Sequence, residues 1–341
     1  MLTWTNSIKA LQDMLSNAKR VLVVSHMNPD GDAVGASLAW RSYLRAAYPN
    51  MEVRVAFPNK FPEFLRWIEG AEQAMAYTDK KEATLDYIKN CDLIFCLDFN
   101  DLSRLEALGE ALAAHSAPRV LIDHHLQPSE EFDLVFSDVS MSSASELVYH
   151  IVVALGGKPL LAKGAAEALY VGLMTDTGSF SFGVKTPKTF RMAADLMELG
   201  IDKDEVASKV YDSYSEKRMR LLGYCLHRKM RVFPKQKAAY ISLSREELDE
   251  FCFQPGDTEG FVNFPLSIKK VALSALFTES QDKTHIRVSL RSKGKILSVN
   301  ELARKHFNGG GHFNASGGKY FDSLKNCEAY FENILKNELY L

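Results

Sequence analysis

Four short apolar segments in the first half of the chain constrain its fold more than any other feature. Each is bounded by polar residues, and stretches of helical character separate most of them; they are residues 21–24, 53–57, 93–97 and 120–122. Strands that are apolar on both faces and alternate with helices are typical of a parallel sheet covered by helices. The first half is therefore predicted to be an α/β domain built on a parallel sheet.

Helical patterns lie between and after these segments. We expect helices over residues 33–47, 162–174 and 187–199. The last has Pro187 near its start and Gly200 at its end, which are the positions that proline and glycine favour at helix termini.

The length of 341 residues predicts two domains. Residues 1–200 form the first predicted domain, 201–231 a charged helical connector, and 232–341 a second, smaller α/β domain. In the second domain we expect strands at 238–243, 271–277 and 286–290, and helices at 299–306 and 324–335.

Composition excludes several classes of protein. Lys plus Arg is 41 and Asp plus Glu is 43, so the net charge of −2 gives no basic excess for a long nucleic-acid partner. Five cysteines without a C-x-x-C pair argue against a disulfide framework or a thiolate zinc site, and favour a reducing compartment. No run of about 18 apolar residues suggests a membrane span. We expect a cytoplasmic protein.

Aspartate and histidine recur where the predicted strands end. The first strand leads into HMNPDGD, the third ends at an aspartate, the fourth ends at DHH, and one further aspartate ends a helical run. Because carboxyl ends of parallel strands meet at one edge of a sheet, we expect these side chains to lie together. They are His26, Asp30, Asp32, Asp98, Asp123, His124, His125 and Asp176.

This donor set predicts a dimetal centre. Carboxylates and imidazoles without a thiolate suit manganese or magnesium, and the histidines favour manganese. The set is too large for one catalytic ion and suits two ions about 3.5–4 Å apart that share a carboxylate, activate a bridging water and hold a phosphoryl group. Gly31 is expected to allow a tight turn between Asp30 and Asp32. Taken singly, an aspartate such as Asp32 is more readily explained as a helix N-cap than as a metal ligand.

The motifs resemble those of the DHH phosphoesterase superfamily. The segment SHMNPDGDAVGAS resembles its first motif, Asp98 in CLDFNDLSRL the second, Asp123-His124-His125 the third and Asp176 in GLMTDTGSF the fourth. GGGHFNASGG resembles the glycine-rich loop of the associated DHHA1 domain. Within the superfamily the chain looks most like the NrnA-like group of nanoRNases and pAp phosphatases.

The resemblance implies roles for the residues of the N-terminal domain. His26 and Asp30 would hold the first ion, Asp98 would bridge both ions, and the second ion would be held by Asp32, His124 and Asp176. Asp123 would orient its neighbours or approach an ion, and His125 would contact the scissile phosphate as charge stabiliser or proton donor.

For the C-terminal domain, the resemblance implies substrate contacts from Arg291, Gly310, Gly311 and His312. The glycines are expected to let the backbone approach a ligand and to offer an anion nest of N–H groups. Two departures from the family pattern stand out. Phe99-Asn100 replaces small hydroxyl residues, and Asn308 replaces the first of four glycines.

The expected activity is metal-dependent hydrolysis of short oligoribonucleotides to mononucleotides and of 3′-phosphoadenosine 5′-phosphate (pAp) to AMP, by attack of a hydroxide that bridges the two ions. A cyclic-dinucleotide phosphodiesterase, a linear-dinucleotide hydrolase or a pyrophosphatase is the enzymatic alternative, and a catalytically silent nucleotide sensor is the non-enzymatic one. Expected partners are short single-stranded RNA or nucleotides, not long duplexes or membranes. A homodimer is compatible with the sequence.

Overall fold

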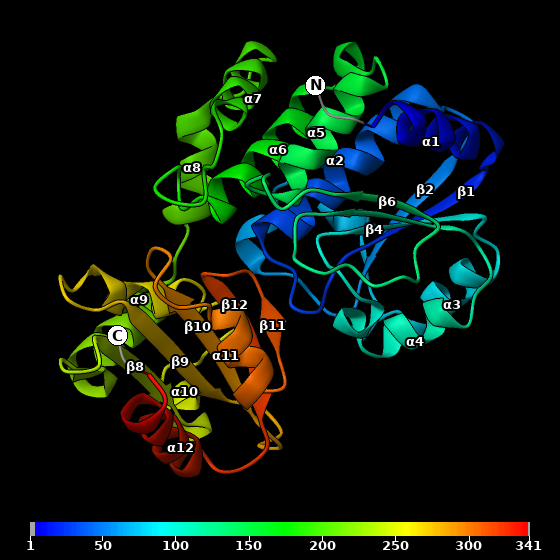
Figure 1. Cartoon of the computed structure of the whole chain (residues 1–341). Helices are drawn as coiled ribbons and strands as arrows, with labels where there is room; N and C mark the ends of the chain where they lie inside the picture. Colours follow the sequence, from blue (N-terminus) through cyan, green and yellow to red (C-terminus); the bar gives the residue numbers. More distant parts are fainter. Residues whose placement is uncertain (1–3, 340–341) are drawn as a thin grey trace. The chain divides into compact units, whose positions relative to one another are not determined.

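The computed structural model describes residues 4–339, and the chain divides into two compact units, Met1–Ser213 and Tyr214–Leu341. Each unit has its own six-stranded sheet (Figure 1). The segment predicted as a connector is helical and is divided between the units. Helix α8 (Lys203–Tyr211) belongs to the first unit, and α9 (Glu216–Tyr224) belongs to the second.

The sheet of the first unit is entirely parallel, as predicted. Its strands run in the order β3-β2-β1-β4-β5-β6. They are β1 (Arg20–Val24), β2 (Glu52–Phe57), β3 (Met75–Ala76), β4 (Leu93–Leu97), β5 (Arg119–Asp123) and β6 (Leu134–Ser137). The strand order reverses between β1 and β4, which are neighbours in the sheet. Open α/β sheets bind ligands at the carboxyl ends of strands at such a reversal.

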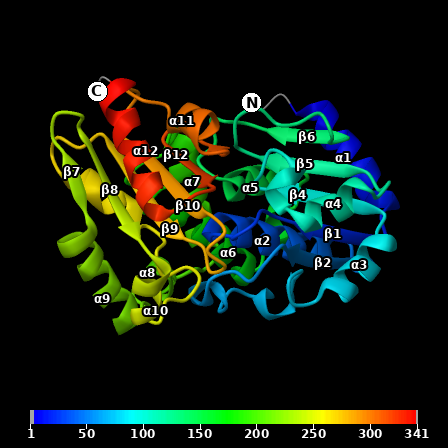
Figure 2. The same cartoon turned by 90° about the horizontal axis from the view of Figure 1, so that it is seen from below.

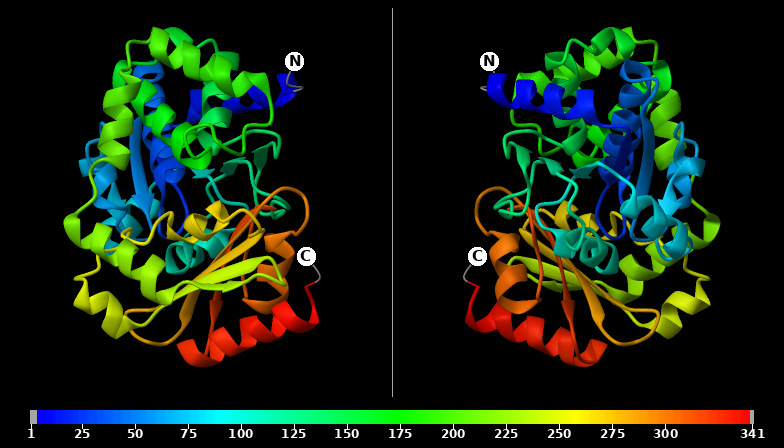
Figure 3. Two further views of the ribbon diagram at one scale, coloured as in Figure 1. Left: turned by 90° about the vertical axis from the view of Figure 1, so that its left-hand side faces the viewer. Right: turned by 90° about the vertical axis from the view of Figure 1, so that its right-hand side faces the viewer.

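Helices cover both faces of this sheet (Figures 1 and 3). Val21 and Val23 of β1 pack into the core beneath α2, α5 and α6, whereas Leu22 and Val24 pack into the core beneath α3 and α4. This alternation explains why the strand is apolar throughout. The helices are α1 (Thr5–Asn17), α2 (Gly31–Ala47), α3 (Lys81–Lys89), α4 (Ala107–Ala113), α5 (Ala144–Ala154), α6 (Lys163–Asp176) and α7 (Pro187–Glu198).

Small residues bring α2 and α6 close together. A Cβ on Gly35 would lie 2.3 Å from the carbonyl oxygen of Ala168, and one on Gly31 would lie 2.5 Å from Thr175 Oγ1. The expectation that Gly31 supplies a tight turn is wrong, because Gly31 is the first residue of α2 and lies outside the set of positive-φ glycines. The small size of Gly31 instead leaves room for the side chain of Thr175 on α6.

The second unit is a smaller mixed α/β domain, as predicted. Its strands follow the order β11-β12-β10-β9-β8-β7, with β8 and β9 parallel and the other pairs antiparallel (Figure 2). Helices α11 and α12 cover one face, and α9 and α10 the other. The elements are β7 (Arg231–Phe233), β8 (Ala238–Leu243), β9 (Leu273–Glu279), β10 (Ile286–Ser292), β11 (Gly310–Gly311), β12 (Ala315–Tyr320), α10 (Arg245–Glu250), α11 (Val299–His306) and α12 (Leu324–Asn337).

None of the helices formed by residues 4–339 combines the length and hydrophobicity that a membrane span requires.

Candidate metal centre

The carboxyl ends of β1 and β4 are tied together at the point where the sheet reverses. The Ser25 hydroxyl, directly after β1, donates a hydrogen bond of 2.7 Å to the carbonyl of Leu97, the last residue of β4. Asp98 follows with a φ of 63°, although it is not glycine, and its N–H donates to the Ile122 carbonyl at 3.0 Å. Strained backbone of this kind concentrates at functional sites, where neighbouring contacts hold it in place.

His26, Asp30 and Asp98 form a first group of potential ligands. His26 Nε2 lies 3.4 Å from Asp98 Oδ2 and 4.0 Å from Asp30 Oδ1. Asp30 is also the N-cap of α2, since its Oδ1 accepts hydrogen bonds from the N–H groups of Asp32 and Ala33, both at 3.1 Å. The helix N-cap is therefore Asp30 and not Asp32, for which the sequence had suggested that role.

Asp32, Asp98, His124 and Asp176 form a second group. His124 Nε2 lies 3.4 Å from Asp98 Oδ1, 3.3 Å from Asp176 Oδ2 and 3.9 Å from Asp32 Oδ2. Asp98 thus directs one carboxylate oxygen toward each group. All the residues predicted as metal ligands lie at this one edge of the sheet, within a single unit of the chain.

Backbone groups near the start of α5 orient two members of the second group. The carboxylate of Asp32 accepts hydrogen bonds from the N–H groups of Ala144 at 2.6 Å and Ser145 at 2.9 Å. His124 Nδ1 lies 3.4 Å from the Met141 carbonyl oxygen. A contact of this kind fixes the imidazole tautomer that leaves Nε2 available to a metal ion.

Asp123 and His125 form a separate pair. His125 Nδ1 lies 2.6 Å from Asp123 Oδ1, and the Asp123 side chain is fully buried. A carboxylate that accepts the Nδ1 proton leaves Nε2 of the imidazole for other chemistry. The predicted orienting role of Asp123 fits this geometry.

The donors fit divalent cations. The buried Asp98 Oδ1 and Asp123 Oδ2 accept no hydrogen bond within the part of the chain that the structure describes. Burial, followed by the charges of Asp98 and Asp176, raises the pKa of Asp32. Burial also acts to raise the pKa of Asp98, but the imidazoles of His124 and His26 outweigh it and lower that pKa. Cations would relieve the repulsion between these crowded carboxylates, and oxygen with imidazole ligands suits manganese or magnesium.

Metal binding is expected to release protons. Burial acts to lower the pKa of His26, but Asp98 and Asp30 outweigh it and raise that pKa to about 9. The imidazole must lose its proton to bind a cation. Calorimetric titration with Mn²⁺ near pH 7.5, in buffers of different ionisation enthalpy, should therefore show proton release, with affinity rising toward pH 9. A heat of binding independent of the buffer would contradict this prediction.

The same raised pKa has a consequence for the metal-free protein. A histidine whose pKa rises on folding from 6.5 to about 9 stabilises the fold fully below the lower value and loses that contribution as pH rises through the upper one. The melting temperature of the metal-free protein should therefore fall from pH 6.5 to 9.

The departure at Phe99-Asn100 has a structural role. Phe99 is fully buried, and its ring centroid lies 6.4 Å from that of Phe132. Asn100 Nδ2 donates to the Leu126 carbonyl at 2.7 Å, which holds the segment that follows His125. The sequence comparison identified these two residues as unusual but did not predict these contacts.

In the second unit, Arg291 and His312 are brought near one end of the sheet. Arg291 of β10 is paired with Ala315 of β12, and the His312 N–H donates to the Ala315 carbonyl at 2.7 Å. Arg287 and Arg291 share the more exposed face of β10, because successive side chains of a strand point to opposite faces.

The expected anion nest at the glycine loop is not supported. The N–H of Gly309 donates to the Ala303 carbonyl at 3.2 Å, and that of Gly311 donates to Asn300 Oδ1 at 3.0 Å. These donors are engaged within the protein. Asn308 adopts a φ of 47°, a left-handed backbone that asparagine tolerates better than most residues, so asparagine can replace glycine there.

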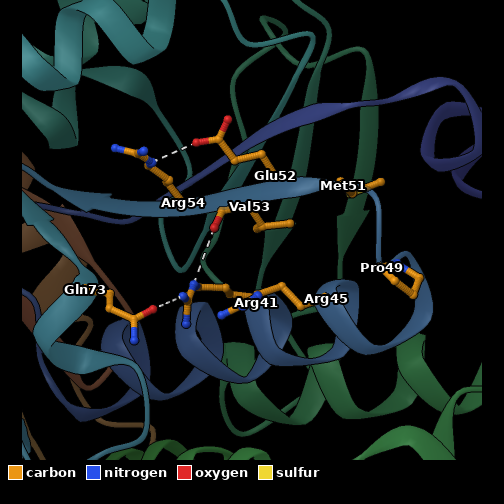
Figure 4. Close-up of a pocket in the computed structure, with 8 residues that line it drawn as sticks. All are labelled: Arg41, Arg45, Pro49, Met51, Glu52, Val53, Arg54 and Gln73. Carbon is orange, nitrogen blue, oxygen red and sulfur yellow. Dashed lines mark hydrogen bonds and ion pairs between the residues drawn. The ribbon is translucent and has the colours of Figure 1, made fainter.

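A pocket of about 490 Å³ lies beside the N-terminal end of β2 (Figure 4). Strand β3 pairs only with Ala56 and Phe57 of β2, which leaves the earlier part of β2 at the sheet edge. Arg41 Nε donates to the Val53 carbonyl at 3.4 Å, and the Arg41 guanidinium also binds the Gln73 side chain. The pocket thus lies where arginine side chains cover an exposed edge of the sheet. It is at the end of β2 opposite to the metal centre.

Comparisons with known proteins agree with this fold. The model of the DHH family, N-terminal domain, matches residues 20–173, and that of the DHHA1 domain matches 236–337. The chain therefore belongs to the DHH family of phosphoesterases. It is an enzyme, a hydrolase of phosphoester bonds.

Relatives of similar length carry a more particular name. The chain is 30% identical to the probable bifunctional oligoribonuclease and PAP phosphatase NrnA of Streptococcus mutans, over 93% of this chain and 95% of the relative. It is 28% identical to the Bacillus subtilis bifunctional oligoribonuclease and PAP phosphatase NrnA, with the same coverage. An exopolyphosphatase-related protein from Bacteroides fragilis has a similar crystal structure, with a TM-score of 0.89, 39% identity and coverage of 97% of this chain and 96% of that one.

Proposed function

We propose that this enzyme hydrolyses short oligoribonucleotides to mononucleotides and pAp to AMP, with two divalent ions, manganese in preference to magnesium. The observation that carries the proposal is the placement of Asp98, whose two carboxylate oxygens lie 3.4 Å from His26 Nε2 and 3.4 Å from His124 Nε2. The names of the NrnA relatives support this choice of substrates.

We assign the two ligand groups to two ions that share Asp98. The first ion is held by His26, Asp30 and Asp98, and the second by Asp32, Asp98, His124 and Asp176. When bound, the ions would supply an activated water for attack on phosphorus and would neutralise charge on the phosphoryl oxygens. The protein holds these ligand side chains in fixed positions at the buried carboxyl edge of the sheet.

His125 acts on the scissile phosphate in this proposal. Its Nδ1 is held by Asp123, so its Nε2 is the atom that donates a proton or a hydrogen bond to an oxygen of the phosphate. Asp123 acts through His125 as a positioning residue.

Arg291, Gly310, Gly311 and His312 are proposed to bind the nucleotide. A guanidinium recognises phosphate through two parallel hydrogen bonds, which a lysine cannot reproduce. We propose that Gly310 and Gly311 contribute by letting the backbone approach the nucleotide closely, and not by forming an anion nest.

Replacing Arg291 with lysine tests this assignment. Arg291→Lys is expected to raise KM for pAp about tenfold, because one or more charged hydrogen bonds worth about 1.5–3 kcal/mol are weakened. Arg287→Lys, on the same face of the same strand, is the matched control and should leave KM unchanged. Equal effects of the two substitutions would mean that Arg291 acts only through the general charge of that face.

A substrate panel tests the proposed function as a whole. RNA of two to five nucleotides, pAp, pyrophosphate and cyclic dinucleotides should be compared at saturating Mn²⁺, with chelated samples as controls. We expect metal-dependent release of mononucleotides from short RNA and of AMP from pAp. Turnover of only pyrophosphate or cyclic dinucleotides would retain the metal centre but overturn the proposed substrates.

A further inference from the structure

Glu146 is a buried carboxylate that plays no part in the proposed metal coordination. It lies in the first turn of α5 and is fully buried. A buried charge costs several kcal/mol unless neighbouring groups compensate for it. The sequence pattern SASE suggests that Glu146 closes a helix-capping box with Ser143, but its carboxylate makes different contacts.

The carboxylate of Glu146 binds the residue before the cap. Glu146 Oε2 accepts hydrogen bonds from the N–H of Ser142 at 2.8 Å and from the Ser142 hydroxyl at 2.5 Å. The hydroxyl of Thr189, on α7, donates to the same carboxylate at 3.1 Å, and His150 Nε2 lies 3.8 Å from Oε1. Ser143 is the N-cap, since its hydroxyl accepts the Glu146 N–H at 3.0 Å.

Ser142 sits between the two backbone contacts that orient metal ligands. Immediately before it, the Met141 carbonyl lies 3.4 Å from His124 Nδ1. Shortly after it, the N–H groups of Ala144 and Ser145 donate to Asp32. A single short segment, residues 141–145, therefore contacts His124 and Asp32, which belong to the same ligand group.

We propose that Glu146 is a positioning residue for the second metal ion, which it serves by fixing residues 141–145 against His124 and Asp32. This inference rests on the proposed dimetal centre. Partners that orient metal ligands typically change metal affinity about 10–100-fold when they are removed. Because His26 and Asp30 form no hydrogen bond or ion pair with residues 141–145 in the part of the chain that the structure describes, the first ion should be insensitive to Glu146.

Calorimetric titration of the full chain with Mn²⁺ tests the proposal. Glu146→Leu fills the same space without an acceptor, and should weaken one of two Mn²⁺ binding steps by about 10–100-fold while the other is unchanged. The weakened step should be the one that Asp32→Asn also weakens. Glu146→Gln keeps a carbonyl oxygen for Ser142 and should retain wild-type affinity. Thr189→Val, which removes a partner of the carboxylate but not Ser142, is the matched control and should bind both ions normally.

Activity at rising Mn²⁺ gives a second measurement. A positioning defect should be recovered at high Mn²⁺, with KM for pAp unchanged. If Glu146→Leu does not fold, Ser142→Ala should weaken the same binding step less strongly, with the exposed Ser140→Ala as its control.

Two unchanged binding steps in Glu146→Leu, or in the Ser142→Ala substitute, would overturn the positioning role and leave the proposed function intact. A defect of Glu146→Gln equal to that of Glu146→Leu would also overturn it, because charge rather than the contact with Ser142 would then be what matters. Failure of the wild-type protein to bind Mn²⁺ at all would count against the proposed function itself.

Discussion

Asp98→Asn is expected to abolish hydrolysis of short RNA and of pAp. The substitution replaces one of the two carboxylate oxygens, so one of the two ligand groups loses its shared donor. Loss of a single group that stabilises transition-state charge lowers kcat by about 10²–10³-fold, and loss of an ion should lower it at least as much. The measurement is the rate of mononucleotide and AMP release at saturating Mn²⁺.

The matched control for this substitution is Asp86→Asn, the same chemical change on the exposed face of α3. It should leave turnover unchanged. Asp98→Asn should also lose one Mn²⁺ binding step in a calorimetric titration while remaining folded by circular dichroism. Turnover near the wild-type rate, in protein free of contaminating nuclease, would contradict the shared-ligand assignment.

His125→Gln is expected to lower kcat by about 10²–10⁴-fold, the range that a positioned proton donor contributes. Both Mn²⁺ binding steps should persist, because His125 is assigned to the substrate phosphate and not to an ion. Asp123→Asn should lower kcat in the same way, since an amide does not hold the imidazole in the tautomer that the 2.6 Å contact favours.

Rates and metal affinities must be measured together for these two variants. His227→Gln, an exposed histidine of the second unit, is the control. Loss of a metal-binding step in His125→Gln would assign His125 to an ion, which its place beside Asp98 and Asp123 would permit geometrically. Unchanged kcat in both variants would remove His125 from the chemistry.

The sequence predicted the centre of each sheet well. The buried strands β1, β4 and β5 stand out because both of their faces are covered, so their apolar runs are continuous. Strand β2 was also predicted, although the exposed Arg54 interrupts its apolar run. The edge strands β3 and β6 were not predicted. Met75–Ala76 is only two residues long, and Leu134–Ser137 is largely half-exposed, so neither leaves a continuous apolar pattern.

The predicted site residues of the first unit lie together because their elements end at one edge. Strand order, however, was not predictable, so the shared position of Asp98 between the two groups came from the family resemblance alone. Asp98 and Asn308 both adopt a left-handed backbone, and their side chains tolerate positive φ better than most others. Residue type alone did not predict the conformation of Asp98, because most aspartates are not left-handed.

Side-chain partners across long sequence separations were the least predictable features. Asp32 and Ala144 are 112 residues apart in the sequence, and no local pattern indicates that they are in contact. The sequence around Glu146 indicates only part of what this residue does. A glutamate three residues after a serine favours a capping box, but a capping glutamate is normally exposed, and its burial becomes apparent only once α7 packs against it.

The most direct test of the central claim is anomalous diffraction at the manganese absorption edge from crystals of the full chain grown with Mn²⁺. We predict two peaks about 3.5–4 Å apart, with Asp98 contacting both, His26 at one and His124 at the other. A single peak, or two peaks that do not share Asp98, would contradict the dimetal centre on which the proposed function rests.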